Sequence, residues 1–179
     1  MVKRFLLAAV MALPIVFAQS AVSAQEPAGA EGAKSRPTRQ EITLQTVQVS
    51  KMTAQQQKSK LDQILADQAG SKTPRSDFLY CIGLAHLGNA KAQACVAKAY
   101  ENGFGVVEDL LEAHAWYALA CQTGFADASD AQKAEEVRDL VKGRLISAYP
   151  HPTEEELDDQ VNALKAKIDQ HQSDMKQTK

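Results

Sequence analysis

YCIGLAHLGNAKA, at residues 80–92, shares its pattern with WYALACQTGFADA, at residues 116–128. The two copies align at an offset of 36 residues (124 − 88 = 36). Because an aromatic residue matches at the same phase as the small residues, the pattern indicates a repeat rather than chance agreement between alanines and glycines. Repeats of this length are typical of stacked helical units. The matched positions are Tyr80 with Trp116, Gly88 with Gly124 and Ala92 with Ala128.

The residues between the two copies predict a pair of antiparallel helices. No helix breaker occurs from Ala92 to Asn102, and Gly103 stands where the first helix ends in a left-handed conformation. Asp109 followed by Glu112 is a capping pattern for the start of the second helix. Small residues and one indole share a face of that helix and would let its neighbours approach closely: Ala113, Trp116, Ala120 and Cys121.

The sequence therefore predicts an all-α fold, a short α-solenoid of antiparallel helix pairs over residues 52–149. Ten residues of this region keep fixed spacing: Tyr100, Gly103, Gly105, Val106, Asp109, Ala113, Trp116, Ala120, Gly124 and Ala128. This pattern resembles the Sel1-like repeat, a relative of the tetratricopeptide repeat. The resemblance covers one full unit, residues 92–127, and the second helix of a preceding unit. It departs from the family where Val96-Ala97 replaces Leu-Gly and Cys121 replaces an alanine.

The resemblance implies a non-catalytic interaction module, an adaptor or scaffold that binds another protein or a peptide. In tetratricopeptide stacks the first helix of each unit lines the concave surface. Carried over to this chain, that face consists of Gln93, Lys98, Glu101 and Asn102. The alternative is a cell-wall or β-lactam-acting hydrolase, an activity linked to cysteine-rich relatives of the repeat. This chain lacks the cysteine spacing of those relatives, since positions 93 and 129 are Gln and Ser.

Residues 1–24 have the three parts of a secretory signal peptide. Lys3 and Arg4 give a positive start, an apolar run follows, and Val22 and Ala24 form a small-residue cleavage site. At about 1.5 Å per residue the apolar run is too short to cross about 30 Å of hydrocarbon. We therefore expect an exported protein without a membrane anchor after cleavage, periplasmic or, alternatively, secreted.

Residues 25–51 are expected to form a disordered leader, because residues 25–40 contain no large apolar side chain. A helix is predicted over Met52–Ala69, with Gly70 as its stop. Apolar residues just before this helix have mixed spacing, which fits a short extended segment or a ragged entry to a helix: Ile42, Leu44, Val47 and Val49.

Residues 150–179 predict a C-terminal amphipathic helix. Thr153 with Glu156 resembles a capping box. The seam fits either a helix that caps the end of the stack or a homodimer through residues 153–175. Its members recur at heptad spacing: Leu157, Val161, Leu164, Ile168, His171 and Met175.

Charge and motifs argue against several functions. Lys and Arg number 20 against 22 Asp and Glu, a formal net charge of −2, so no basic excess is present for binding nucleic acid. No phosphate loop, dinucleotide fingerprint or nucleophile elbow occurs. We predict no catalytic residue, no cofactor and no metal. The histidines, which lack metal-ligand spacing, are His86, His114, His151 and His171.

The three cysteines lie in the repeat region. Cys81 and Cys95 are equally distant from Gly88 (88 − 81 = 7 and 95 − 88 = 7), so they could face each other across an antiparallel helix pair. An exported protein allows such a disulfide to persist. The sequence predicts a Cys81–Cys95 bridge, with three free thiols as the alternative. Cys121 fits a small buried apolar residue.

Overall fold

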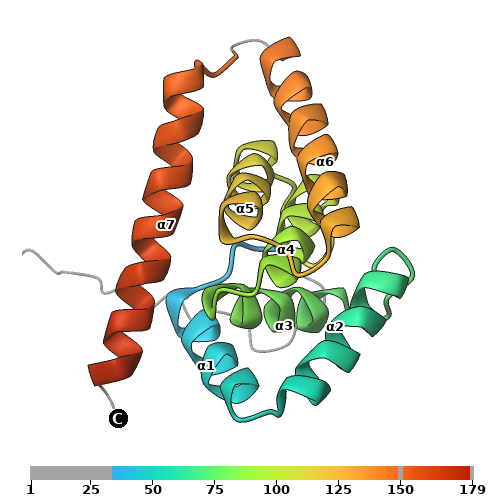
Figure 1. Ribbon diagram of the computed structural model, residues 1–179, viewed down its shortest axis with the longest axis vertical. Helices are drawn as coiled ribbons and strands as arrows, with labels where there is room; N and C mark the ends of the chain where they lie inside the picture. The colour runs from blue at the N-terminus through green and yellow to red at the C-terminus, as the bar shows by residue number, and fades with distance from the viewer. Residues whose placement is uncertain (1–33, 149–150, 178–179) are drawn as a thin grey trace, which may run out of the picture. The chain divides into compact units, whose positions relative to one another are not determined.

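The computed structural model describes residues 34–148 and 151–177. The signal peptide expected over residues 1–24, and the leader as far as residue 33, lie outside the described residues. All regular secondary structure in the described part is helical, which confirms the all-α prediction (Figure 1). The helices are α1 (Arg39–Ser50), α2 (Ala54–Asp67), α3 (Pro74–His86), α4 (Ala90–Asn102), α5 (Leu110–Thr123), α6 (Ala128–Ser147) and α7 (Glu154–Gln177).

Helix α1 shows that the disordered leader expected through residue 51 is wrong from residue 39 to residue 50, and that of the two forms considered for Ile42 to Val49 the helical one is present. Thr38 caps the helix: its hydroxyl oxygen accepts from the Glu41 N–H at 3.2 Å, and the Glu41 carboxylate accepts from the Thr38 N–H at 2.8 Å. Helix α1 packs against α3, where a Cβ on Gly83 would lie only 3.1 Å from the backbone of Gln45. The helix depends on this tertiary contact for its stability. The irregular spacing of its apolar residues therefore does not predict a helix.

Helix α2 is shorter than the predicted Met52–Ala69. It begins after Thr53, whose side chain accepts from the Gln56 N–H at 3.3 Å while Gln56 accepts from the Thr53 N–H at 2.9 Å. It ends at Asp67. Gly70, the predicted stop, is not among the described glycines with positive φ. The end of α2 therefore uses no left-handed cap.

The helices from α3 to α6 pack on one another in chain order. Helix α4 ends at Gly103, whose φ of 65° is left-handed, as the sequence predicted. The Asp109 carboxylate then accepts from the N–H groups of Leu111 and Glu112, both at 3.1 Å, and starts α5. Alanines without exposed surface let α4 and α5 approach closely: Ala92, Ala97, Ala99, Ala113, Ala115 and Ala120.

Helix α7 returns across the helices that precede α6. It packs mainly against α5 and has a smaller contact with α3 (Figure 1). The predicted capping box is present, since the Glu156 carboxylate accepts from the Thr153 N–H at 2.7 Å and the Thr153 hydroxyl oxygen accepts from the Glu156 N–H at 3.2 Å. Most of the heptad seam is buried within the chain: Leu157, Val161, Leu164, Ile168 and His171.

The described helices belong to one compact unit that begins at Gly32. Helix α1, which precedes the predicted domain start at residue 52, packs on α3 as part of this unit. Among the described helices, none has an apolar stretch of the length that a bilayer crossing requires.

Candidate binding pocket

The repeat motif is mainly structural. Gly105 shows this most directly, because a Cβ at this position would lie 2.1 Å from the carbonyl oxygen of Pro74. Gly124 and Ala128 are exposed at the α5–α6 connection, and Asp109 caps α5. The remaining motif residues are buried: Tyr100, Gly103, Gly105, Val106, Ala113, Trp116 and Ala120.

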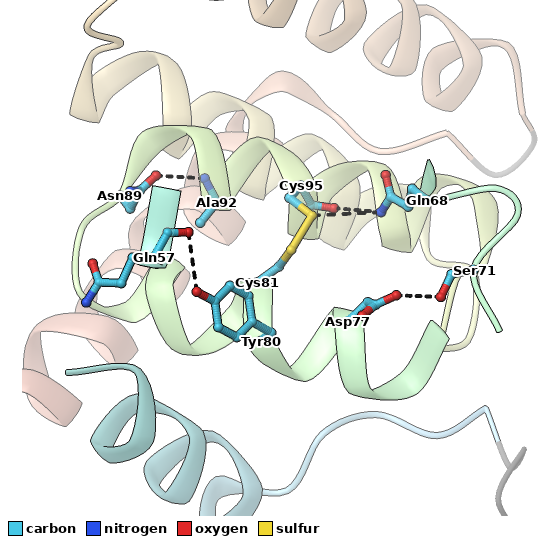
Figure 2. The surroundings of a disulfide bond; sticks show 9 residues. All are labelled: Gln57, Gln68, Ser71, Asp77, Tyr80, Cys81, Asn89, Ala92 and Cys95. Atoms are coloured by element: carbon cyan, nitrogen blue, oxygen red, sulfur yellow. Dashed lines mark hydrogen bonds between the residues drawn. A yellow bond between two sulfur atoms is a disulfide. The ribbon is translucent and has the colours of Figure 1, made fainter. Parts of the chain in front are cut away.

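A disulfide joins Cys81 of α3 to Cys95 of α4, with Cα atoms 6.1 Å apart (Figure 2). Both side chains are buried, and the side-chain amide of Gln68 donates to the backbone oxygen of Cys95 at 3.3 Å. The pairing is the one that the symmetry about Gly88 suggests. Cys121 is a free, partly buried thiol.

Of the four residues of the predicted protein-binding face, Gln93 is buried, so its inclusion is wrong, whereas the other three keep exposed surface. Gln93 is 2% exposed, and its side-chain amide donates to the Ala85 backbone oxygen at 3.3 Å. Glu101 is half-buried and pairs with Arg144 of α6 at 3.1 Å. Lys98 and Asn102 are exposed. Helices α3 and α6 therefore engage two of the four side chains that were expected to meet a partner, Gln93 and Glu101.

A different surface has the form of a binding site. A pocket of about 540 Å³, here called the α1–α7 pocket, lies between α1, α3, α5 and α7, with Tyr100 of α4 at its base. Its buried residues form the floor: Ile82, His86, Tyr100, Trp116, Leu164 and His171. Its exposed residues form the mouth: Arg36, Arg39, Ala166, Lys167 and Gln170. Pro37, Ile42 and Glu112 lie between the floor and the mouth.

Two histidines from distant parts of the chain meet on the floor. The Nδ1 atoms of His86 and His171 are 3.0 Å apart, and the ring centroids are 4.8 Å apart. The His86 ring also lies against Trp116, with centroids 5.9 Å apart. The side-chain amide of Gln172 donates to the His86 backbone oxygen at 2.7 Å. These contacts fix α7 to α3.

The hydrogen-bond network assigns the tautomer of each ring. The Thr43 hydroxyl donates to the backbone oxygen of Arg39 at 2.9 Å. Its oxygen therefore accepts from Nε2–H of His171, 3.1 Å away. A neutral His171 then carries only a lone pair on Nδ1, so the proton between the rings belongs to Nδ1 of His86. This leaves Nε2 of His86 as a hydrogen-bond acceptor.

That acceptor belongs to a residue that lines the pocket. Within the described residues, the buried side-chain nitrogens and oxygens without a partner are Gln68 Oε1, Gln93 Oε1 and His114 Nδ1. Nε2 of His86 makes no hydrogen bond with the described residues and is not among these atoms, and His86 itself lines the pocket. Burial and the nearby His171 lower the pKa of His86 to about 4, which keeps this ring neutral near neutral pH.

The mouth carries three cationic side chains, which differ in whether they form an ion pair. Arg36 pairs with the Asp109 carboxylate, and Arg39 pairs with Asp174. Lys167 is exposed and forms no ion pair with the residues that the structure describes. Lys167 is therefore the cation of this mouth without an ion pair among the described residues, although its charge acts on the Glu112 carboxyl and counteracts the rise in that group's pKa.

Glu112 brings a carboxyl group to the wall of the pocket. Burial, helped by the Asp109 carboxylate, raises the pKa of Glu112. The Gln160 side-chain amide donates to Glu112 at 3.3 Å, and an Arg36 nitrogen lies 3.7 Å from the same carboxylate. These contacts hold the carboxyl group in place between α5 and α7.

Sequence reasoning missed this pocket. The two floor histidines are 85 positions apart, and their meeting depends on the return path of α7. One signal was present in the sequence: His171 occupies a seam position among aliphatic residues, and a histidine buried there needs a polar partner.

A second pocket of about 410 Å³, between α5, α6 and α7, is lined by the free thiol of Cys121 and by His114. Burial raises the pKa of Cys121, whereas a nucleophilic cysteine needs a lowered pKa. In the described part of the chain, no group of three or more His, Cys, Asp or Glu side chains is arranged to hold a metal ion.

Comparison of the chain with protein-family models, with curated proteins and with solved structures gives no match. The resemblance to the Sel1-like repeat therefore stays a prediction from the sequence.

Proposed function

We propose that this protein is an exported, non-catalytic binding module that holds a segment of another protein, or a peptide, in the α1–α7 pocket. The signal-peptide pattern of residues 1–24 supports export to the periplasm or, alternatively, secretion. The chain-order packing from α3 to α6 supports a short Sel1-like α-solenoid as the scaffold. Helix α7 closes one side of the pocket.

The observation that carries this proposal is the combination of an apolar floor with polar groups held at fixed positions. Ile82, Trp116 and Leu164 give apolar contact area, and His86 offers an oriented acceptor beside them. Ligand sites are typically concave, mostly apolar and about 300–1,000 Å³ in volume, with a few placed polar groups. The pocket meets each of these criteria.

The lining also favours binding over hydrolysis. The described residues that line the pocket include no serine, threonine or cysteine. The Thr43 hydroxyl beside His171 lies outside this lining and donates to the backbone oxygen of Arg39, so it is not placed to act as a nucleophile in the pocket. The free thiol of Cys121 lies in the other pocket, and its pKa is raised by burial. No observation favours the hydrolase alternative.

Selection of displayed random peptides on the full chain, without the expected signal peptide, tests the proposal. Ala166 is exposed at the mouth, so Ala166→Trp should block the pocket. Ala163→Trp is the matched control, because Ala163 is an exposed alanine of α7 that does not line the pocket. We expect selected peptides to bind the wild type and Ala163→Trp but not Ala166→Trp. Failure to enrich any peptide, or equal binding to all three proteins, would refute the proposal.

A further inference from the structure

We infer that the α1–α7 pocket receives a tyrosine or tryptophan side chain of a partner polypeptide, with a carboxylate next to that side chain. This inference rests on the proposed function and adds the chemistry of the ligand. Three features carry it: a histidine nitrogen on the floor with a free lone pair, aromatic and apolar side chains around it, and a lysine at the mouth that forms no ion pair with the described residues.

The acceptor requires a donor from the ligand. Nε2–H of His171 donates to the Thr43 hydroxyl oxygen, so Nδ1 of a neutral His171 accepts from Nδ1–H of His86. This leaves a lone pair on Nε2 of His86. A ligand that covers this nitrogen without donating a hydrogen bond to it would remove its water and leave the acceptor unsatisfied, which weakens binding. The inserted group therefore carries an O–H or N–H.

The surround favours an aromatic donor. Trp116 and Leu164 line the floor together with Ile82, so the ligand side chain that carries the donor should be largely apolar. A lysine or arginine of the ligand would bring a charge onto this apolar floor, and Lys167 at the mouth would repel it. Tyrosine and tryptophan combine a large apolar ring with one polar atom. Phenylalanine has the ring but no donor.

The mouth favours a carboxylate beside the ring. Arg36 and Arg39 already pair with Asp109 and Asp174. Lys167 is exposed on the same mouth without an ion pair among the described residues. A carboxylate of the ligand, either from a neighbouring acidic residue or from the end of the chain, can pair with this ammonium group once the ring is inserted.

Three small probes separate these requirements on the wild-type protein. N-acetyltyrosine has the ring, the donor and the carboxylate; N-acetylphenylalanine lacks the donor; N-acetyltyrosine amide lacks the carboxylate. Trp116 is the chain's single tryptophan and lies on the floor, so its fluorescence, excited where tyrosine does not absorb, reports occupancy. We expect N-acetyltyrosine to bind about fivefold tighter than N-acetylphenylalanine, because one hydrogen bond contributes about that factor to the affinity. Equal or tighter binding of the phenylalanine probe would overturn the inference.

The amide probe tests the lysine. We expect N-acetyltyrosine amide to bind about two- to fivefold more weakly than the acid, with the difference shrinking as salt is added. Lys167→Gln should abolish that difference. Lys165→Gln should keep it, because Lys165 is an exposed lysine of α7 outside the pocket lining. A difference that survives in Lys167→Gln contradicts the assignment of the carboxylate to this residue.

The outcomes distinguish this inference from the proposed function. If selected peptides bind the pocket but the tyrosine hydroxyl gives no advantage, the ligand chemistry is wrong and the proposed function stands. If N-acetyltyrosine binds with the expected preferences while no peptide containing tyrosine or tryptophan beside an acidic residue binds as tightly, the polypeptide partner is wrong. The ligand is then a free aromatic acid.

Discussion

His86 and His171 place their Nδ1 atoms 3.0 Å apart, and this contact fastens α7 to α3 at the floor of the pocket. While both rings are neutral, one proton lies between them, because the N–H of His171 is on Nε2 and donates to the Thr43 hydroxyl oxygen. An additional proton adds a positive charge to a pair of side chains that are each only 6% exposed. The contact should therefore respond to acid.

We expect the free energy of unfolding to fall as the pH drops from about 6.5 to about 4. Burial and His171 lower the pKa of His86 to about 4, so the unfolded chain binds the proton first. The stabilisation is complete above about pH 6.5 and is lost progressively below it, up to about 3 kcal/mol for this residue. Urea unfolding followed by circular dichroism across this pH range measures the change.

Other histidines also titrate in this pH range, so matched variants are needed to isolate the contribution of His86 to the pH dependence. Burial and Arg39 lower the pKa of His171, and Asp174 opposes them. Burial also lowers the pKa of His114. Replacing His86 by phenylalanine should flatten the pH dependence, whereas His151→Gln, at an exposed position, should not change it. An equal slope in the wild type and His86→Phe would contradict the prediction.

The central helix ends could be predicted because they are encoded locally. Gly103 ends α4 in a left-handed conformation and Asp109 caps α5, and each effect spans only a few residues. The pocket could not be predicted in the same way. It requires α7 to return across α5, and nothing within the heptad seam itself specifies which surface the seam covers.

The two errors at α1 and Gln93 have a related cause. Helix α1 has no apolar stripe of its own and depends on packing against α3, where Gly83 leaves room for its backbone. Gln93 carries a polar side chain on α4, yet α3 supplies a backbone acceptor that allows its burial. In both cases a neighbour far along the chain overrides the local pattern.

We expect loss of the Cys81–Cys95 disulfide to lower the free energy of unfolding by about 3 kcal/mol. The bridge closes a loop with a sequence separation of 14, and in the chain-entropy description such a crosslink restricts the unfolded state. Urea unfolding with and without a thiol reductant measures the effect. Cys121→Ala should show the same response to the reductant, because Cys121 is outside the bridge. A response that persists in the Cys81→Ala, Cys95→Ala double variant would argue against the bridge.

Gly105→Ala should destabilise the fold by more than about 3 kcal/mol. A Cβ there would lie 2.1 Å from the Pro74 carbonyl oxygen, and the φ of +72° is itself unfavourable for alanine. Gly124→Ala is the control: its φ is +85°, but nothing lies within 4 Å of the added Cβ, so only a backbone cost of about 1–3 kcal/mol applies. The two losses follow from urea unfolding curves, and equal losses would show that contact with Pro74 is not the cause.

We expect the protein to be monomeric, because the seam of α7 is already covered within the chain. Leu157, Val161 and Ile168 are 2%, 4% and 4% exposed. A coiled-coil dimer would have to remove these side chains from α5 and α3, at about 25 cal/mol for each Å² of apolar surface uncovered. Sedimentation equilibrium measures the mass directly. A dimer that becomes a monomer when the chain is shortened to end before Thr153 would instead assign the seam to an interface between two copies.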